Sequence, residues 1–328
     1  MERRTFIKLI GGGALGVSLP LGIHGTTAAP ARDKWGDLLP LRDFGSTGRQ
    51  VTMLGVGGFH VGRMSDYDAE KTIETGMAGG IRFFDAAESY VGGLNEVKYG
   101  KFLTPKYRDE IFLMTKTKAR DGSGATSHLE GSLRRMNTDY VDLWLMHQVD
   151  SKMDFDSLRE RGMLDAFLRA KQSGKVKHIG FSGHRNPEAS LYVLSETGDI
   201  MEANMLPVNL LDPSYRSFIN DVIPELENKK AGIIGMKSVA GGGFWGGGFE
   251  GNRKQSESVM DHVTVRDAIH FAMSMPVDVL VTGAQNPEML QEKIDLAHSF
   301  TKLSSDEQRK LIEKVAHLGG NSIEYYKA

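Results

Sequence analysis

Short apolar runs alternate with longer amphipathic segments along most of the chain, and the alternation predicts strands and helices in turn. Ile81, Phe83 and Phe84 form a short apolar run ending at Asp85, typical of a buried strand. The segment Ser65–Met77 instead repeats its apolar residues at helical spacing, and two glycines follow it as a stop signal. Further strands are predicted at Thr52–Val56, Glu110–Lys116, Val141–His147, Lys177–Ser182, Ile200–Met205, Gly232–Lys237 and Val277–Gly283. Further helices are predicted at Asn95–Leu103, Thr126–Met136, Asp156–Ser173, Pro187–Thr197, Tyr215–Lys229, Val263–Met275 and Pro287–Phe300.

Eight strands that each precede a helix favour a parallel sheet closed into a (β/α)8 TIM barrel. An open doubly wound sheet is the alternative, but no Gly-x-Gly-x-x-Gly turn follows a strand and opens a helix. Leu41–Val51 reads as an N-terminal β-hairpin around a Gly-Ser-Thr-Gly turn. Ser304–Leu318 is amphipathic and predicts an extra C-terminal helix against the barrel wall or bottom.

Titratable side chains stand at the ends of successive predicted strands. Asp85 ends one strand, and Tyr90 follows it just before a glycine pair. Lys116 and His147 end the next two strands. Because active sites of barrels lie at the carboxyl ends of the strands, these four residues predict a proton-transfer site.

The first thirty-one residues predict an export signal and not part of the barrel, which leaves residues 32–328 as the domain. Arg3-Arg4 precedes a glycine-rich apolar stretch, Leu9–Ile23, that is too short to span a bilayer comfortably. Small residues at 29–31 offer a cleavage point. An ordinary secretory signal or an uncleaved anchor is the alternative. The paired arginines resemble a bacterial twin-arginine (Tat) signal, which implies export of a folded protein to the periplasm with no stable membrane insertion of the mature chain.

Composition narrows the classes of function. The formal net charge of −2 gives no electrostatic reason to expect nucleic acid or an anionic membrane as a partner. The sequence has no cysteine, which excludes disulfides, thiolate nucleophiles and cysteine-ligated metals, and no metal site is predicted. Hydrophobic residues make up 40% and charged residues 25%, as in ordinary globular proteins.

The longest interruption lies between Val239 and Ser258 and sets three aromatics, Phe244, Trp245 and Phe249, among glycines. Long loops that carry their own side chains are often lids or binding loops. A disordered insertion is the alternative. The aromatics favour a lid over the substrate.

Several motifs resemble those of the aldo-keto reductase family over nearly the whole mature chain. Any one motif alone is weak evidence for the family. Together they occur in the family's order, at the spacing expected for successive strands of a barrel. They are the N-terminal hairpin, Phe83-Phe84-Asp85-Ala86-Ala87 with Tyr90, Thr115-Lys116, Asp142-Leu143-Trp144-Leu145-Met146-His147, Ile179-Gly180-Phe181-Ser182, and Thr282-Gly283-Ala284-Gln285-Asn286-Pro287-Glu288.

The resemblance implies a catalytic tetrad and hydride transfer from a nicotinamide cofactor to a small carbonyl substrate, or the reverse oxidation. Tyr90 would donate the proton, its pKa lowered by the ammonium of Lys116. Asp85 would hold Lys116, and His147 would orient the carbonyl. The structural alternatives are a buried Asp85–Lys116 ion pair, a core histidine and an ordinary loop tyrosine. Four such residues at strand ends favour catalysis.

At the positions where the family contacts its cofactor, this sequence matches some of the family's residues and differs at others. Gly57 and Gly58 match a loop whose backbone approaches the cofactor, Ser182 matches a nicotinamide contact, and Glu292 matches an adenine contact. Departures are Gly183 for an asparagine, Met205 for a glutamine, Met236 for the stacking aromatic, and Lys293 for an asparagine. Ala284 and Gln285 follow Gly283 where NADP-dependent members often carry basic residues, so Lys237 and Lys293 would supply the charge for a 2′-phosphate. NADP is expected, with NAD as the alternative.

Two other functions stay open from the sequence. The departures around the nicotinamide ring are compatible with a redox sensor that holds the cofactor with little turnover. A barrel hydrolase or aldolase would instead use Lys116 as a Schiff-base amine.

Overall fold

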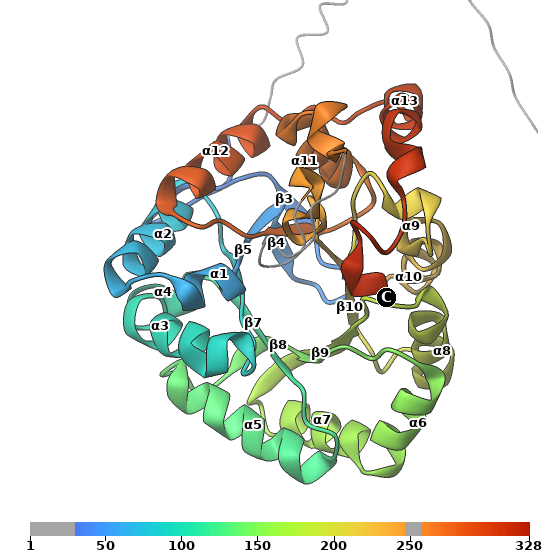
Figure 1. Ribbon diagram of the computed structural model, residues 1–328. Helices are drawn as coiled ribbons and strands as arrows, with labels where there is room; N and C mark the ends of the chain where they lie inside the picture. The colour runs from blue at the N-terminus through green and yellow to red at the C-terminus, as the bar shows by residue number, and fades with distance from the viewer. Residues whose placement is uncertain (1–29, 247–256) are drawn as a thin grey trace, which may run out of the picture.

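Eight parallel strands close into a barrel surrounded by helices, as predicted from the alternation of patterns (Figure 1). The computed structural model describes residues 30–246 and 257–328. Around the barrel the strands follow the order β10-β11-β12-β5-β6-β7-β8-β9. Their bounds are β5 Leu54–Gly57, β6 Phe83–Asp85, β7 Phe112–Thr117, β8 Val141–Met146, β9 Val176–Ser182, β10 Ala203–Pro207, β11 Gly232–Met236 and β12 Val279–Thr282.

The main helices form the outer ring and mostly begin with a side-chain cap. Ser65 caps α2 and Asp121 caps α5, each accepting a hydrogen bond from a backbone N–H in the first turn. The helices are α1 Gly58–Arg63, α2 Asp66–Ala78, α3 Leu94–Phe102, α4 Thr104–Tyr107, α5 Gly122–Arg135, α6 Lys152–Glu160, α7 Met163–Gln172, α8 Pro187–Thr197, α9 Phe218–Asp221, α10 Ile223–Lys229, α11 Val265–Ser274, α12 Pro287–His298 and α13 Ser305–Val315.

Two helix predictions need correction, and a short helix was not predicted. The predicted helix Asp156–Ser173 is two helices, α6 and α7, because Gly162 between them adopts a left-handed φ of 76°. The predicted helix Tyr215–Lys229 begins only at α9 and breaks again before α10. The short helix α1, which follows the first barrel strand directly, was not predicted, since six residues with two glycines give too weak a pattern.

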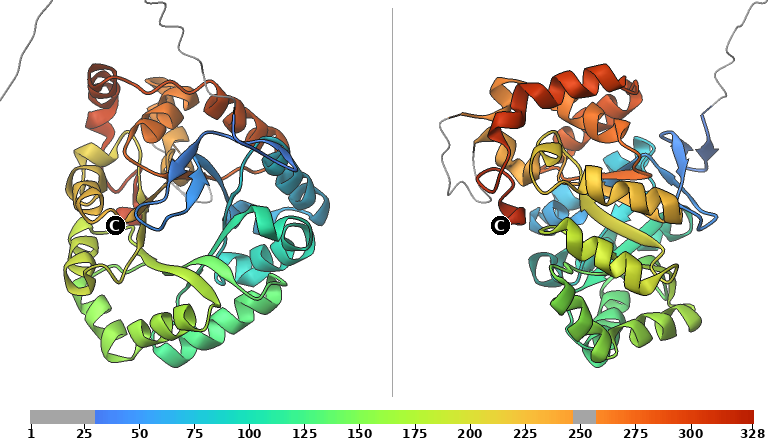
Figure 2. Two further views of the ribbon diagram at one scale, coloured as in Figure 1. Left: turned by 180° about the vertical axis from the view of Figure 1, so that it is seen from behind. Right: turned by 90° about the vertical axis from the view of Figure 1, so that its right-hand side faces the viewer.

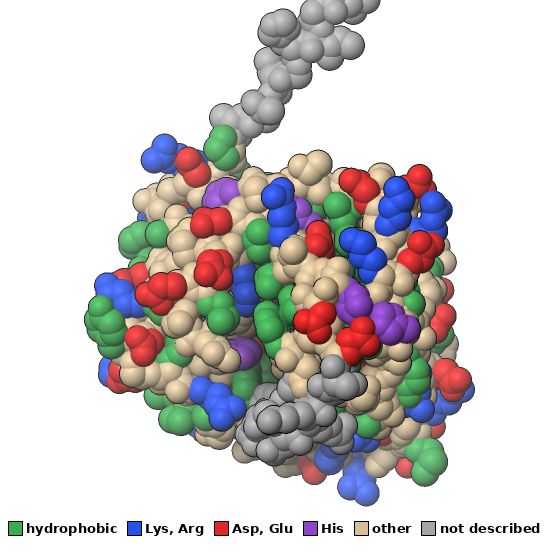
Figure 3. Space-filling view, turned by 45° about the horizontal axis from the view of Figure 1, so that its top comes forward, with side chains coloured by type: hydrophobic (Ala, Val, Ile, Leu, Met, Phe, Trp, Pro, Cys, Tyr) green, Lys and Arg blue, Asp and Glu red, His purple; other side chains and the backbone are tan. Residues whose placement is uncertain are grey.

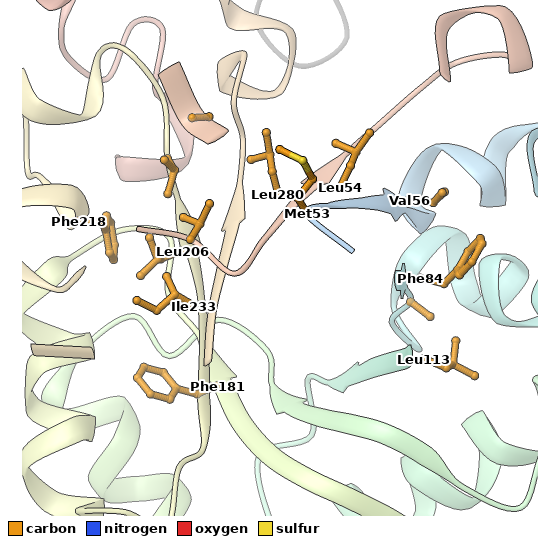
Figure 4. Close-up of a cluster of buried hydrophobic side chains, with 14 of the residues drawn as sticks. Met53, Leu54, Val56, Phe84, Leu113, Phe181, Leu206, Phe218, Ile233 and Leu280 are labelled. Carbon is orange, nitrogen blue, oxygen red and sulfur yellow. The ribbon is translucent and has the colours of Figure 1, made fainter. Parts of the chain in front are cut away.

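Apolar side chains that point away from the barrel axis fill the layer between strands and helices. Val56, Phe84, Leu113, Phe181, Leu206, Ile233 and Leu280 all lie on this face (Figure 4). Alternate residues of the same strands point inward and form a second cluster, so that both faces of the sheet are buried.

The predicted N-terminal hairpin closes the amino-terminal end of the barrel. Strands β3 Leu41–Asp43 and β4 Gln50–Thr52 pair antiparallel, and a further short pair, β1 Arg32–Asp33 and β2 Gly36–Asp37, precedes them. Phe44 in the hairpin turn is fully buried, with its ring centroid 5.1 Å from that of Phe112, which stacks on Phe83. This aromatic plug seals one end, and the C-terminus lies at the opposite end (Figure 2).

The predicted extra C-terminal helix is α13, followed by the short turns η7 Ala316–Leu318 and η8 Tyr325–Lys327. The predicted export signal, residues 1–31, lies almost entirely outside the described residues. Among the residues described, no helix combines the length and apolarity that a bilayer crossing requires.

Candidate active site

Strand alternation brings three of the four predicted catalytic residues into the barrel interior. Asp85 lies two residues after the inward-facing Phe83, and Lys116 lies two residues after the inward-facing Met114. His147 follows β8 two residues after Leu145. Because side chains on a strand alternate with a period of two, all three point along the inner face at the carboxyl end.

A cavity of about 840 Å³ opens at this end of the barrel. Asp85, Tyr90 and His147 line it, whereas Lys116 lies behind them with a side chain only 1% exposed. The volume falls within the ~300–1,000 Å³ range of small-molecule sites.

Direct contacts join Asp85, Lys116 and Tyr90. Lys116 Nζ forms an ion pair with Asp85 Oδ1 and donates to the phenol oxygen of Tyr90 at 2.8 Å. The Tyr90 hydroxyl lies 3.4 Å from Asp85 Oδ2. Lys116 also donates to the Ala86 carbonyl at 2.9 Å, so its three protons are engaged. A buried amine with these partners is poorly placed to attack a substrate, which disfavours the Schiff-base alternative.

A run of left-handed residues turns the chain immediately after Tyr90. Val91, Gly92 and Gly93 have φ angles of 53°, 63° and 89°. A positive φ at the β-branched Val91 is unfavourable by itself and persists only because its surroundings enforce it. The turn lets α3 begin at once and holds the phenol ring over Lys116, with the ammonium 4.4 Å from the ring centroid.

Burial and charge leave Tyr90 as a neutral phenol. Burial raises the pKa of Tyr90 well above 10, and the neighbouring Asp85 carboxylate raises it further. This direction is opposite to the predicted lowering by Lys116, because desolvation and Asp85 outweigh the ammonium. The phenol therefore keeps its proton at neutral pH, as a proton donor must.

Burial also draws the pKa values of the ion pair toward each other. It raises the pKa of Asp85 and lowers the pKa of Lys116, while their mutual attraction opposes both shifts. The backbone N–H of Gly58 hydrogen-bonds the Asp85 carboxylate as well.

His147 is a neutral imidazole beside the phenol. Burial, and then the charge of Lys116, hold its pKa well below 6.5. Its ring lies 5.8 Å from the Tyr90 ring, centroid to centroid, and its Nδ1 lies 3.3 Å from the Ser89 hydroxyl. Since His147 also faces the cavity, it is positioned to hydrogen-bond a ligand oxygen that contacts Tyr90.

The predicted cofactor contacts fall into two groups. Those that line the cavity are Gly57, Met205, Lys237, Gly283 and Gln285. Ser182, Gly58 and Glu292 do not line it. The Ser182 hydroxyl is fully buried and accepts from the Gln148 backbone N–H at 3.0 Å, and a Cβ at Gly58 would meet the Asp85 carbonyl oxygen at 2.2 Å. These two residues therefore support neighbouring backbone, and Glu292 is exposed on α12.

Two lysines make the β11–β12 side of the cavity cationic. Lys237 and Lys293 both line it, and burial lowers the pKa of each to about 8. In residues 30–246 and 257–328, no carboxylate oxygen lies within 4.0 Å of either Nζ. Lys293 donates to the Gly283 carbonyl, and Lys237 lies 5.5 Å from the Tyr326 ring centroid. Cations without a counter-ion in a cavity fit an anionic ligand such as a phosphate.

Several lining residues were not predicted. His60 and Phe59 come from α1, and His184 follows β9. Tyr325 and Tyr326 reach the cavity from the C-terminal tail, which is anchored by an ion pair between Lys327 Nζ and Asp212 Oδ1 at 2.7 Å. His184 lies two residues after Ser182, where a strand is predicted to end. Its position could therefore have indicated a cavity residue from the sequence.

The aromatic residues of the predicted lid lie in different places: Phe244 is in the core and Trp245 lines the cavity. Phe244 is fully buried, and Gly243 beside it packs on Ile323, so Phe244 does not cover a ligand. Trp245 is 55% exposed and lines the cavity with Gly241 and Gly242. Phe249 lies outside the described residues.

Residues 53–316 match the family model described as the Aldo/keto reductase family. The 6-dehydroglucose reductase of Agrobacterium fabrum (strain C58) is 29% identical over 247 residues, 68% of this chain and 80% of that protein. The L-glyceraldehyde 3-phosphate reductase of Escherichia coli (strain K12) is 26% identical over 221 residues, 60% of this chain and 61% of that protein.

Among solved structures, the holo form of the aldo-keto reductase AKR11C1 from Bacillus halodurans superposes with a TM-score of 0.71. The match covers 88% of this chain and all of that one at 21% identity, and thus supports the same fold.

Proposed function

Because the chain belongs to the aldo/keto reductase family and is an NAD(P)-dependent oxidoreductase, we propose that it reduces an aldehyde, ketone or sugar carbonyl, or runs the reverse oxidation. The observation that supports this most is the Lys116 Nζ to Tyr90 hydroxyl contact of 2.8 Å beside His147 at the cavity wall. A sugar carbonyl is favoured, since relatives are named for sugar substrates and polar groups such as His184 and Gln148 line the cavity.

In the proposed reduction, a nicotinamide cofactor held at Lys237 and Lys293 would supply the hydride for the carbonyl carbon. Tyr90 donates its phenolic proton to the carbonyl oxygen, which takes the electron pair of the C=O bond. Lys116 stabilises the phenolate that remains, and Asp85 holds Lys116 in place. His147 orients the oxygen and needs no charge to do so.

Steady-state turnover with a panel of sugar and simple carbonyl compounds tests the proposal and separates it from the sensor alternative. We expect nucleotide oxidation that depends on the carbonyl compound. Tight nucleotide binding without turnover on any carbonyl or alcohol would favour the sensor.

Lys237 and Lys293 would hold the cofactor phosphates, with NADP as the proposed cofactor. We expect Lys237→Met to weaken NADPH binding by about 10- to 100-fold, the value of a hydrogen bond to a charged group at ~1.5–3 kcal/mol. Lys118 lines the opposite rim of the cavity, so the Lys118→Met variant serves as the matched control. Fluorescence titration of NADPH and NADH with each protein gives the dissociation constants.

The same lysines set the pH dependence of nucleotide binding. Both pKa values are lowered to about 8 in the folded chain, so the ammonium groups are charged below that pH and lose charge above it. NADPH affinity should therefore stay level up to neutral pH and weaken as pH rises through about 8. The measurement should extend to pH 9.5, about 1.5 units above that pKa. If the NADPH affinity of the unsubstituted chain does not change over this range, the two lysines do not hold the cofactor phosphates.

We also propose that the chain is exported to the periplasm by the twin-arginine machinery with its cofactor already bound. Nicotinamide nucleotides are recycled in the cytoplasm, and a bound ligand stabilises the folded state that this route requires. Replacing Arg3 and Arg4 with lysine should retain the protein in the cytoplasm. Denatured periplasmic protein should release about one nucleotide per chain; folded periplasmic protein free of nucleotide would refute the coupling.

A further inference from the structure

Three potential metal ligands converge outside the active-site cavity. Glu257 Oε1 lies 2.6 Å from His262 Nε2 and 3.5 Å from His317 Nε2. All three donor atoms lie within 4.8 Å of one another, and the two imidazole rings meet edge to face. Histidine and acidic side chains gather side by side on the face shown in Figure 3.

The three residues come from two separate segments of the chain. Glu257 and His262 flank the short turn η6 Val259–Asp261, and His317 belongs to η7. None of the three lines the cavity, and their side chains are 44%, 29% and 52% exposed. The cluster is therefore accessible to an ion from solvent and is independent of the tetrad.

We propose that Glu257, His262 and His317 bind a divalent transition-metal ion of the zinc class. Two neutral imidazole nitrogens and one carboxylate oxygen form a donor set that suits Zn²⁺ and carries one negative charge. Tetrahedral ligands at ~2.0–2.1 Å from zinc lie about 3.3 Å from each other. The Glu257–His317 separation of 3.5 Å matches this spacing, and the hydrogen bond between Glu257 and His262 must open slightly. Water completes the fourth position.

Metal binding at this cluster would tie the segment around η6 to the C-terminal region. The Ser258 hydroxyl, next to Glu257, donates to the Phe244 carbonyl at 2.6 Å. Gly243, next to Phe244, packs on Ile323 in the tail that supplies Tyr325 and Tyr326. The ion would thus join the segments around η6 and η7, which contact the cavity-lining η4 (Ala240–Trp245) and tail without touching the reacting atoms.

Co²⁺ and Zn²⁺ titrations of the untagged full chain test the site. We expect one saturable Zn²⁺ site per chain by calorimetry, a Co²⁺ visible spectrum typical of four-coordination, and a melting temperature that rises with Zn²⁺ concentration. His262→Gln and His317→Gln should each weaken Zn²⁺ binding by more than about tenfold, since changes outside the ligand shell alone cost 10–100-fold. Turnover without added metal should be unchanged in both variants.

His298→Gln removes an exposed histidine elsewhere and is the matched control. Circular dichroism confirms that each variant is folded. The proposal is overturned if the unsubstituted chain shows no saturable Zn²⁺ or Co²⁺ binding. It is also overturned if folded His262→Gln and His317→Gln bind Zn²⁺ as tightly as the His298→Gln control. None of these outcomes depends on the carbonyl reaction.

Discussion

Tyr90→Phe is expected to lower kcat for carbonyl reduction by about 10²–10⁴-fold, the usual contribution of a positioned general acid. Tyr90 is the neutral acid of the tetrad, because burial and Asp85 raise its pKa well above 10. The phenylalanine ring retains the packing against Phe59 and His147, so NADPH affinity should stay within a few-fold. Stopped-flow or steady-state kinetics with the best carbonyl substrate measure the loss.

Tyr325→Phe is the matched control, since it removes a hydroxyl from the same cavity at the tail side. Its kcat should change far less than that of Tyr90→Phe. If Tyr90→Phe keeps more than about a tenth of kcat, a loss far below the range for a general acid, another group donates the proton. The raised pKa of Tyr90 also implies that reduction tolerates moderately alkaline pH, whereas oxidation, which needs the phenolate, should accelerate as pH rises.

Lys116→Met is expected to abolish turnover and to destabilise the barrel at the same time. Removing the ammonium leaves the Asp85 carboxylate buried without its cation, which costs ~3–5 kcal/mol. Urea unfolding at neutral pH measures the stability, and kinetics at saturating NADPH measure turnover. The double variant Asp85→Asn with Lys116→Met removes both charges, and should recover much of the stability and none of the activity.

A second buried ion pair, Arg108–Asp142, provides a control that distinguishes a loss of stability from a loss of catalysis. Arg108 Nη2 lies 2.9 Å from Asp142 Oδ2, and Asp142 also accepts from the Leu113 backbone near the start of the strands. Arg108→Met should therefore lower stability while leaving kcat nearly unchanged. Recovery of turnover in the Asp85→Asn, Lys116→Met double variant would mean that the active-site pair is structural only.

The strand-based part of the site was predictable from sequence, and the part built by tertiary packing was not. Asp85, Lys116 and His147 each stand at an inward position of a short apolar run, so the two-residue period places them together. The direction of the Tyr90 pKa was not predictable, because it depends on how completely the folded barrel excludes water.

The tail residues illustrate the limit most clearly. Tyr325 and Tyr326 reach the cavity through contacts with residues more than a hundred positions earlier, such as the 2.9 Å hydrogen bond from Asn209 to the Tyr326 hydroxyl. No local periodicity encodes such a contact. In the same way, the break at Gly162 reflects one left-handed residue inside a continuous amphipathic pattern.

The aromatic plug of Phe44, Phe83 and Phe112 has a kinetic consequence. Since the interior of the barrel is filled from that end in the described residues, the cofactor and substrate of the proposed reaction would both enter from the carboxyl end. Whatever lies against the tetrad must arrive before the molecule that covers it and depart after that molecule. In the proposed reaction this arrangement would make binding sequential, and release of the deeper ligand would be a candidate for the slowest step.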